Sequence, residues 1–330
     1  MESIRWGIIG AGSIADTVAG DFAFVPQAEL VAVASRDPER SRRLARKHGI
    51  PVIHRDYRAL IESDGIDVVH IATTHPHHRD IALAAISAGK AVLVEKAFTV
   101  TLAGTEEVVA AATEAGVFAM EAMWTRFLPA VEAAREVVAW GRIGQVLGVQ
   151  GDLCAFRPYD PTNRLWDPAT GGGALLDLGV YVISMAQDFL GSSRDVHCAG
   201  RYAPNGVESA ATMNISYIGG GTAALTCGFD VHGPGRMTIF GTKGWVEIQP
   251  RFHHPTTISV HRSGVLPRII EAKQIGRGYA HELMEVSDCL LAGQTQSATM
   301  PLADTVEVMR VLESCLKQLG RPQEEAKVEI

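Results

Sequence analysis

The sequence predicts an α/β protein: an N-terminal doubly wound parallel sheet, then a C-terminal α+β domain with a large, mostly antiparallel open sheet. Three observations support this. Short β-branched runs alternate with helical stretches over the first 120 residues, which is the pattern of parallel βαβ units. Beyond residue 122, β-type runs follow one another without helices between them, as in an antiparallel sheet. The length of 330 residues is that of about two domains.

The N-terminal half is expected to hold six parallel strands joined by crossover helices, which together form the first domain, residues 1–121. The helix between the second and third strands has clear ends. Asp37 is its expected N-cap, Pro38 its first residue and Gly49 its stop, around Glu39 to His48. The expected strands are Ile4 to Ile9, Leu30 to Ala34, Val52 to His54, Asp67 to Ala72, Ala91 to Glu95, and Val117 to Met120.

The second domain is predicted over residues 122–330. Gly-rich turns such as Ile218 to Gly221 join its strands, and helices flank them. The expected helices are Leu128 to Ala139, Ala174 to Leu190, Tyr279 to Leu291, and Ala303 to Leu319. The expected strands are Asp195 to Ala203, Ala210 to Tyr217, Thr222 to Asp230, Met237 to Phe240, and Trp245 to Ile248.

The composition excludes several classes of protein. With 30 Lys plus Arg, 37 Asp plus Glu and a net charge of −7, the chain lacks the basic footprint that nucleic acids and anionic membranes require. The five cysteines are odd in number and form no CxxC pair, which argues against a disulfide framework or a zinc cluster. We recognise no basic leader and no apolar run of about 20 residues, so we expect a cytoplasmic protein.

A glycine-rich turn follows the first expected strand and opens a helix: Gly10-Ala11-Gly12-Ser13-Ile14-Ala15. In a dinucleotide site of the Rossmann type, the first glycine permits the turn and the second lets the backbone approach the pyrophosphate. Alanine is an accepted third residue. We therefore predict that Gly10, Gly12, Ser13 and Ile14 bind a dinucleotide; the alternative is a tight turn without a ligand.

The end of the second strand distinguishes NAD from NADP, because an acid there binds the ribose of NAD and an arginine accommodates the extra phosphate of NADP. Here Ser35 and Arg36 hold that place, while Asp37 is better explained as a helix cap. The sequence therefore predicts NADP, with NAD possible as an alternative, and with Ser35, Arg36 and Arg40 at the phosphate. Alternatively, Arg36 stacks on the adenine or is only solvated.

Two further segments carry candidate catalytic groups. Lys96 ends the fifth strand, at the sheet edge where ligands bind in such folds. Much later, a run from Gly171 to Tyr181 begins the long helix, and Asp177 and Tyr181 lie four residues apart on one expected helical face. Surface or core packing is the alternative explanation for each residue taken singly.

Taken together, these motifs resemble the Gfo/Idh/MocA oxidoreductase family. The glycine loop, the Thr73 to His78 segment, the Glu95-Lys96 pair and the GGGxLxDxGxY run match the family in order and approximate spacing, over nearly the whole chain. The stretch Met120 to Phe127 is more specific. It resembles the subgroup of dimeric dihydrodiol dehydrogenases, which also includes NADP-dependent D-xylose dehydrogenases.

The resemblance implies exchange of a hydroxyl and a carbonyl group on a sugar, polyol or cyclic diol. Lys96 and Tyr181 would be the proton-transfer pair and Asp177 would orient them, since hydride transfer makes or consumes an alkoxide. Both groups ordinarily have pKa values near 10, which a positively charged oxidised nicotinamide would lower. The resemblance also implies a homodimer or homotetramer through the C-terminal sheet. The further residues it places at the cofactor are Thr73, Thr74, Pro76, His78, Glu95, Lys96 and, on a covering loop, Arg164.

One departure from the family is Ala97, which stands where a proline usually follows the lysine and fixes the local turn, often through a cis bond. Substrate contacts are expected from Lys96, Trp124, Phe156, Asp177, Tyr181 and Tyr279, with Arg126 and Trp166 as further candidates. The histidines at 75, 77, 78, 253 and 254 lack partner ligands at metal-site spacing, so no metal is predicted.

Two other functions are compatible with the same fold. One is an NAD-assisted glycosidase, which would oxidise a sugar, eliminate the aglycone and reduce the product again without net redox turnover. The other is a non-catalytic sensor of the nucleotide or a sugar. The presence of Lys96, Asp177 and Tyr181 together counts against a sensor, in which a catalytic set would decay.

Overall fold

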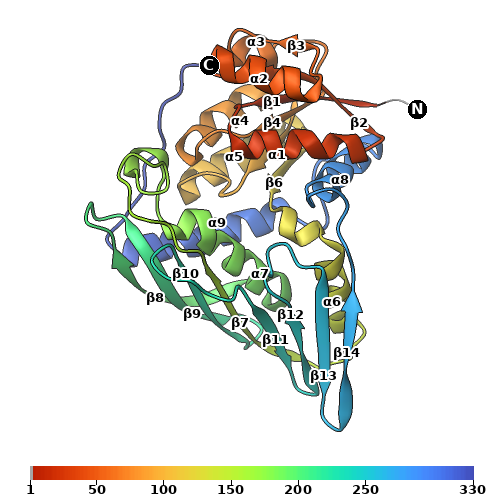
Figure 1. The fold of residues 1–330 in the computed structure, drawn as a ribbon, viewed down its shortest axis with the longest axis vertical. Coiled ribbons are helices and arrows are strands. Elements are labelled where there is room, and N and C mark those ends of the chain that lie inside the picture. The colour runs from red at the N-terminus through yellow and green to blue at the C-terminus, as the bar shows by residue number, and fades with distance from the viewer. Residues whose placement is uncertain (1–2) are drawn as a thin grey trace. The chain divides into compact units, whose positions relative to one another are not determined.

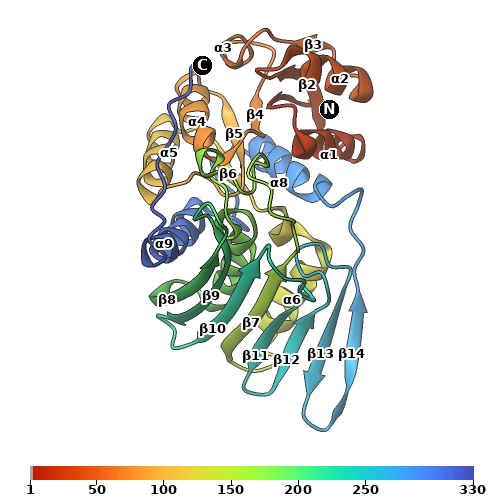
Figure 2. The same cartoon turned by 60° about the vertical axis from the view of Figure 1, so that its left-hand side comes forward.

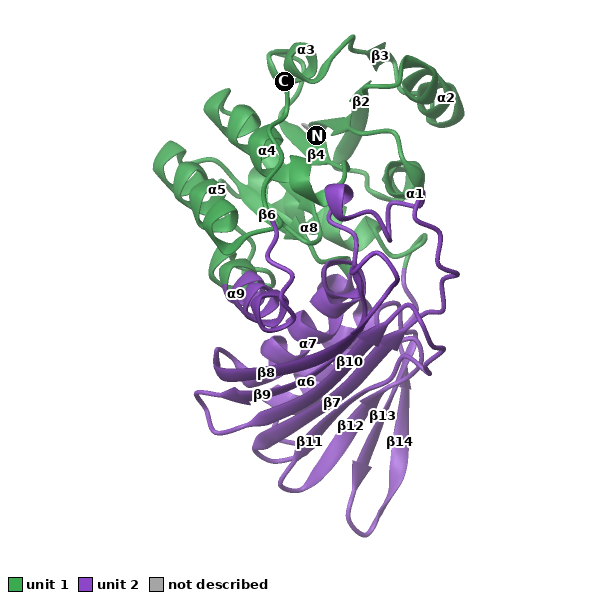
Figure 3. Cartoon of the chain, turned by 90° about the vertical axis from the view of Figure 1, so that its left-hand side faces the viewer, with its two compact units in different colours: residues 1–124, 275–306, 324–330 green, residues 125–274, 307–323 purple. Residues whose placement is uncertain are grey.

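The computed structural model describes residues 3–330, and these form two compact units (Figure 3). Unit 1 comprises Met1–Trp124, Ile275–Val306 and Glu324–Ile330, and unit 2 comprises Thr125–Gln274 and Glu307–Gln323. The sequence suggested two continuous segments, 1–121 and 122–330. The units differ from these because helix α8 (Ala280–Leu291) and the last residues of the chain pack with the N-terminal strands and helices.

Unit 1 contains the predicted doubly wound parallel sheet (Figure 1). Its strand order is β3-β2-β1-β4-β5-β6, and every neighbouring pair is parallel. The strands are β1 (Ile4–Ile9), β2 (Ala28–Ala34), β3 (Val52–Ile53), β4 (Val68–Ile71), β5 (Ala91–Glu95) and β6 (Ala119–Ala122). The helices between them are α1 (Ser13–Asp21), α2 (Pro38–His48), α3 (Tyr57–Ile61), α4 (His78–Ser87) and α5 (Leu102–Ala115).

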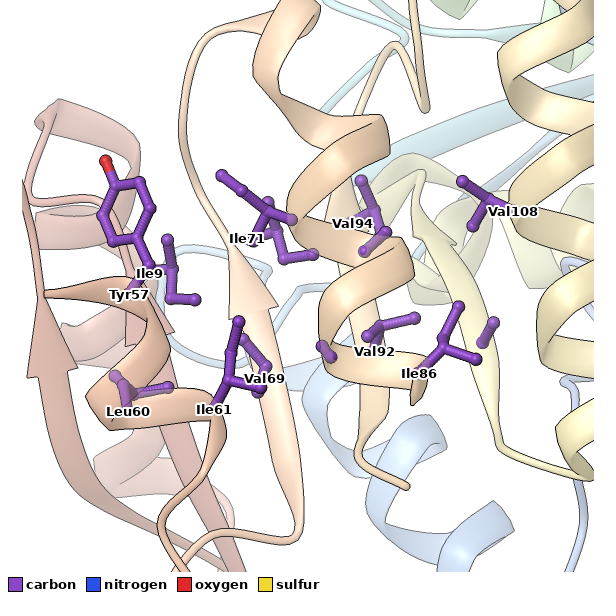
Figure 4. Close-up of a cluster of buried hydrophobic side chains, with 14 of the residues drawn as sticks. Ile9, Tyr57, Leu60, Ile61, Val69, Ile71, Ile86, Val92, Val94 and Val108 are labelled. Carbon is purple, nitrogen blue, oxygen red and sulfur yellow. The ribbon is translucent and has the colours of Figure 1, made fainter. Parts of the chain in front are cut away.

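The central strands are buried on both faces, as expected for a parallel sheet with helices on either side. All residues of β4 and β5 are buried. Figure 4 shows one side of this core, where Ile71 and Val94 from the sheet lie with Ile86 of α4 and Val108 of α5. Because these strands are parallel, the carboxyl ends of β1, β2, β4 and β5 lie along one edge of this buried sheet.

The predicted ends of α2 are confirmed. The Asp37 carboxylate accepts hydrogen bonds from the backbone N–H groups of Glu39 and Arg40, at 3.0 and 3.2 Å. Pro38 begins the helix, and Gly49 ends it in the left-handed conformation.

The last residues of the chain follow the surface of unit 1. Glu325 Oε1 accepts hydrogen bonds from the Val100 and Thr101 backbone N–H groups and from the Thr101 hydroxyl, at 3.2, 3.0 and 2.8 Å. Ala326 N–H donates to the Pro76 carbonyl at 3.1 Å. The segment thus connects the loops that follow β4 and β5, which both contain predicted cofactor residues.

Unit 2 contains the predicted second sheet, with the strand order β14-β13-β12-β11-β7-β10-β9-β8 (Figure 2). All pairs are antiparallel except β7 with β10, which is parallel. The strands are β7 (Val146–Cys154), β8 (Ser193–Tyr202), β9 (Glu208–Tyr217), β10 (Thr222–Gly228), β11 (Met237–Gly241), β12 (Gly244–Ile248), β13 (Thr257–Arg262) and β14 (Val265–Glu271).

One face of this sheet is covered by α6 (Pro129–Ala139) and α7 (Val180–Leu190), which pack on its strands. Val149, Ile239 and Val246 lie opposite one another on neighbouring strands and are buried on that face. Helix α9 (Leu302–Gln318) also lies close to β8, where the Gln318 side chain bonds the backbone of Val196 and Cys198.

The structure differs from the expected elements at three strands and one helix. β7, β13 and β14 were not among the expected strands. The helix expected from Ala174 to Leu190 begins instead with a π-helical segment, η5 (Leu175–Gly179), before α7. A π segment has i→i+5 hydrogen bonds and is frequent at functional sites.

The segment Pro168–Leu190 also corrects the expectation that no apolar run approaches membrane-spanning length. It is long and apolar enough by length and composition, but 78% of its most apolar window is buried inside the structure. Its apolar side chains, Val182, Ile183, Met185 and Ala186 among them, are packed in the core of the protein.

Candidate functional site

The glycine turn of unit 1 has the geometry of a phosphate-binding loop. Gly10 follows β1 with φ of +108°, and a Cβ at this position would overlap the carbonyl oxygen of Ala72 at the end of β4. Gly12 precedes α1 and has open space where a side chain would lie. No side chain of the described residues caps α1, so its first backbone N–H groups are available to an anion.

A basic hollow of about 370 Å³ lies beside this turn. Gly12 and Ser13 line it together with Arg40, Arg43 and Lys47 of α2. Lys47 pairs with Asp16 at 2.6 Å, and this contact and a hydrogen bond from His48 keep the pKa of the Asp16 carboxyl below its usual value. Three cations and one carboxylate give the hollow a net positive charge, which suits a phosphate.

Arg43 and Lys47 were not among the predicted cofactor residues. They follow Arg40 at positions i+3 and i+7 on an 11-residue helix, so all three lie on one face. This spacing is visible in the sequence and is the signal that would have identified them.

The residues at the end of β2 differ in their availability. Arg36 is exposed and lies near Tyr57 and His77. Burial is the main cause that lowers the pKa of the His77 imidazole, and the positive charge of Arg36 lowers it further. The Ser35 hydroxyl is buried and donates to the Asp37 carbonyl at 2.6 Å, with Ser41 Oγ also within 2.7 Å. A contact between Ser35 and a phosphate therefore stays a prediction.

The loop after β4 carries one polar atom suited to a cofactor. Thr73 Oγ1 is buried and has no hydrogen-bond partner among the described residues. Such a hydroxyl at the carboxyl edge of the sheet fits a dinucleotide that would supply its partner. Thr74 Oγ1 instead lies 2.8 Å from His77 Nδ1, and Pro76 is buried in the same turn.

His78 is fully buried and connects two loops of the edge. Its Nδ1 lies 3.0 Å from the Ala97 carbonyl and its Nε2 lies 3.2 Å from the Thr73 carbonyl. Burial lowers the pKa of this imidazole, so it is neutral and donates one of these bonds at a time. The predicted contact of His78 with a cofactor ribose stays a prediction.

Lys96 follows β5, half-buried, and belongs to the same edge. The peptide bond between Lys96 and Ala97 is cis, although alanine stands where the family has proline. The preceding Glu95 is buried, with Oε1 3.3 Å from His70 Nε2. The Glu95 side chain thus has an internal partner, and its predicted role at the cofactor stays a prediction.

Two predicted substrate residues of unit 1 lie together. The rings of Trp124 and Tyr279 are stacked, with centroids 4.3 Å apart and an interplanar angle of 17°. Trp124 is buried and Tyr279 is half-buried. The pair offers the aromatic surface that recognition of a ring-shaped substrate requires.

The predicted catalytic residues of unit 2 lie where the π segment passes into α7. Asp177 Oδ1 accepts a long hydrogen bond from Arg164 Nη2 at 3.4 Å, so the residue predicted on the covering loop pairs with a predicted catalytic carboxylate. Tyr181 is 7% exposed, and its ring centroid lies 5.6 Å from that of His253. No sequence pattern placed His253 beside Tyr181, because the two are 72 residues apart.

Other candidates from unit 2 have structural partners. Arg126 is fully buried, and its guanidinium donates to Ser184 and Gln187, so it is part of the core rather than a pocket wall. Trp166 is also buried and donates from Nε1 to the Pro158 carbonyl, which closes its own loop. Phe156 is 44% exposed and remains available for contact with a substrate.

The predicted catalytic residues are divided between the units, with Lys96 in unit 1 and Asp177 and Tyr181 in unit 2. Their grouping around one substrate stays a prediction. Within residues 3–330, no group of three or more His, Cys, Asp or Glu side chains is arranged to hold a metal ion.

Glu208 is a buried acid that the sequence did not identify. Its Oε1 accepts from the Leu175 backbone N–H at 3.3 Å, where the π segment begins, and its Oε2 lies 3.8 Å from Arg321 Nε. Burial raises the pKa of this carboxyl to about 7. The folded protein therefore holds a proton on Glu208 that the unfolded chain releases above pH 4.5.

Comparisons with known proteins agree with this geometry. Residues 4–123 match the family described as "Oxidoreductase family, NAD-binding Rossmann fold", and residues 131–247 match the "GFO/IDH/MocA C-terminal domain". The chain is 34% identical to trans-1,2-dihydrobenzene-1,2-diol dehydrogenase of Bos taurus, over 96% of this chain and 97% of that protein. The enzyme of the same name from Homo sapiens is 33% identical, with the same coverage.

Solved structures share the fold. Aldose-aldose oxidoreductase from Caulobacter crescentus, complexed with glycerol, has a TM-score of 0.88 and is 26% identical, over 97% of this chain and 98% of that one. A levoglucosan dehydrogenase has a TM-score of 0.89 over 98% of both chains; at 21% identity it supports the fold alone. The predicted fold class is confirmed.

The buried Glu208 leads to a prediction about stability. Because the folded state retains its proton between pH 4.5 and about 7, this group makes the free energy of unfolding fall as pH rises through that range. The shift corresponds to roughly 3 kcal/mol. Glu208→Gln keeps an acceptor for Leu175 but cannot ionise, so its stability should fall less between pH 5 and pH 8.

Urea unfolding at several pH values measures this difference. Glu136→Gln, at an exposed position of α6, is the matched control and should follow the wild type. Parallel pH dependences for wild type and Glu208→Gln would contradict the assignment of a raised pKa to Glu208.

Proposed function

The chain belongs to the GFO/IDH/MocA oxidoreductase family, and from that premise we propose that it interconverts a hydroxyl and a carbonyl on a sugar, polyol or cyclic diol, preferring NADP. It is an NAD(P)-dependent dehydrogenase acting on hydroxyl groups. One observation carries the proposal: the start of α1 has no side-chain cap and lies at a basic hollow. This arrangement suits a phosphorylated dinucleotide.

The cofactor, when bound, supplies or accepts the hydride through its nicotinamide ring. Gly12, Ser13 and Ile14 would bind its pyrophosphate through backbone N–H groups at the start of α1. Thr73 would bond it from the loop after β4, through the hydroxyl that has no partner among the described residues. Arg40 and Arg43 of the basic hollow, with the exposed Arg36 that follows β2, would hold the extra phosphate of NADP.

The chain's own catalytic task is to move a proton. Oxidation of an alcohol requires that its hydroxyl proton be accepted, and reduction of a carbonyl requires that the forming alkoxide be protonated. We assign this transfer to the Lys96 ammonium and the Tyr181 hydroxyl. Asp177, which pairs with Arg164, would orient them. The stacked Trp124 and Tyr279 would contact the ring of the substrate.

The first prediction about function concerns turnover. The wild type should oxidise aldoses or trans-diols with NADP⁺, or reduce keto-sugars or diketones with NADPH. Lys96→Met should lower kcat by at least about 100-fold, the usual contribution of a general acid or base, while changing NADP affinity only several-fold. Tyr181→Phe should act similarly, and Lys243→Met, at an exposed turn, is the control.

The alternative functions predict other results in the same assay. Tightly retained cofactor with glycoside cleavage and no net redox turnover would indicate the glycosidase. Cofactor binding without turnover on any substrate would indicate a sensor. Normal turnover by Lys96→Met would remove Lys96 from the mechanism.

The second prediction concerns the choice of cofactor. Arg36→Ala should weaken NADPH binding by roughly 10- to 100-fold, because a charge-assisted hydrogen bond contributes about 1.5–3 kcal/mol. NADH binding should change less than about twofold. Titration of each cofactor by protein fluorescence measures both affinities, with Arg42→Ala on the exposed side of α2 as the control. An undiminished NADPH preference would refute the role of Arg36.

We also propose that the chain forms a homodimer or homotetramer through the uncovered face of the unit 2 sheet. Phe240 and Trp245 lie opposite each other on β11 and β12, each 41% exposed, and His261 stacks on Trp245 with centroids 4.6 Å apart. A row of aromatic side chains on three neighbouring strands of an uncovered sheet face is suited to burial in an interface. Beyond Phe240, the same cross-strand line continues through the small and polar residues Gly148, Thr222, Ser216 and Asp195.

The third prediction follows from this row. Phe240→Asp together with Trp245→Asp should convert the wild-type oligomer to smaller species, because buried carboxylates would oppose association. Sedimentation velocity measures the change. Ile218→Asp, in the exposed turn between β9 and β10, is the control and should not alter the assembly. A wild type that sediments as a stable monomer would contradict the proposal.

A further inference from the structure

The segment that precedes α8 is held by one buried carboxylate. Asp21, the last residue of α1, is 1% exposed. Its oxygens accept hydrogen bonds from the backbone N–H groups of Arg277 at 2.9 and 3.0 Å, Tyr279 at 2.9 Å and Ala280 at 3.1 Å. These amides lie at the start of α8, where no intrahelical carbonyl is available to them. A carboxylate that accepts several backbone hydrogen bonds is strongly held in place.

The turn is packed closely against the same carboxylate. Gly276 has φ of +58°, and a Cβ there would lie 2.5 Å from Asp21 Oδ1 and 2.8 Å from Phe24 Cδ2. Only glycine allows the chain to pass Asp21 at this distance in this conformation. The position of Asp21 and the path of residues 276–280 therefore depend on each other.

The charge of Asp21 is accommodated by these bonds. The nearby Glu282 of α8 is fully buried, and neither of its carboxyl oxygens has a hydrogen-bond partner among the described residues. Burial, with the charges of Glu95 and Asp21, raises the pKa of Glu282 well above its ordinary value, so Glu282 is neutral. Asp21 therefore accepts these backbone hydrogen bonds without an ionised neighbour at Glu282.

Tyr279 is the residue through which this arrangement reaches the candidate substrate surface. Its backbone N–H bonds Asp21, while its ring stacks on Trp124. Loss of the carboxylate would leave three amides at the start of α8 without their acceptor and release the backbone that carries the ring. The stack depends on a backbone position that Asp21 determines.

We propose that Asp21 is a positioning residue for the substrate, which holds the 277–280 turn so that the Tyr279 ring lies on Trp124. This inference rests on the proposed function, since it takes the aromatic pair as the substrate surface. Helix α1 then serves both ligands from the two ends of its nine residues: its first turn faces the basic hollow and its last residue holds the turn that carries Tyr279. Asp21 touches neither ligand and acts through Tyr279.

A double-mutant cycle tests the proposal. Asp21→Ala, Tyr279→Ala and the double variant are assayed with NADP⁺ and either trans-1,2-dihydrobenzene-1,2-diol or D-xylose. Asp21→Ala should raise KM about tenfold, with kcat and NADP⁺ affinity each changed less than about threefold. If Asp21 acts through Tyr279, the double variant should have nearly the KM of Tyr279→Ala alone. Independent, additive effects on KM would overturn the proposal.

Near-UV circular dichroism provides a readout that does not need turnover. Loss of the Tyr279–Trp124 stack in Asp21→Ala should reproduce the spectral change of Tyr279→Ala, and an unchanged aromatic spectrum would overturn the proposal. Asp64→Asn, an exposed carboxylate of unit 1, is the control. If Asp21→Ala does not fold, Asp21→Asn keeps one acceptor oxygen and should be intermediate, while Gly276→Ala should displace the turn with the carboxylate intact.

The outcomes separate the two claims. No cofactor-dependent turnover by the wild type would count against the proposed function. Normal wild-type turnover with an unchanged KM in Tyr279→Ala would remove the aromatic pair from the substrate site, and the role of Asp21 with it. A large effect of Tyr279→Ala beside a wild-type KM in Asp21→Ala would overturn only the inference about Asp21.

Discussion

A line of close backbone contacts along the carboxyl edge of the six-stranded sheet determines how unit 1 presents its candidate residues. Gly10 passes over the Ala72 carbonyl at a distance that no side chain permits. The buried ring of His78 then lies between the carbonyls of Thr73 and Ala97 and donates a hydrogen bond to one of them at a time. These contacts hold the loops after β1, β4 and β5 to one another. The positions of the loops in turn determine where the glycine turn, the Thr73 hydroxyl and Lys96 lie. Parallel strands make this possible because all their carboxyl ends share one edge.

The hydrogen-bond donors around each buried carboxyl group decide whether burial raises its pKa. Where a carboxylate has several donors, as Asp21 has, it remains in the interior and organises the backbone that bonds it. Where donors are few, as at Glu208 and Glu282, desolvation raises the pKa and the group takes up a proton. The net charge of −7 therefore does not describe the basic hollow beside the glycine turn, where Arg40, Arg43 and Lys47 lie on one helix face.

Sequence patterns predicted the six parallel strands, the cap at Asp37 and the glycine turn, because each is recognised from neighbours within a few residues. β7 was missed because Gly148 and Gly151 interrupt its alternation. β14 contains four apolar residues, but Pro267 interrupts the run, and a proline is tolerated only in an edge strand such as this one. β13 does alternate, with Ile258 and Val260 buried, and its pattern is readable. The basic face of α2 was likewise readable, from the spacing of Arg43 and Lys47.

By itself, the sequence determined the family, the parallel and antiparallel sheets and the glycine turn, and it proposed Lys96, Asp177 and Tyr181 as candidate groups. These features are recognised from short motifs and runs, and few unrelated proteins would carry the same combination of them. Only the tertiary structure decided that Tyr279 stacks on Trp124, that Asp21 holds the start of α8 and that burial raises the pKa of Glu208 to about 7. Each of these features depends on residues that are far apart in the chain. Burial determines the strength of the hydrogen bonds and the size of the pKa shift, and burial is a property of the folded molecule rather than of any one segment.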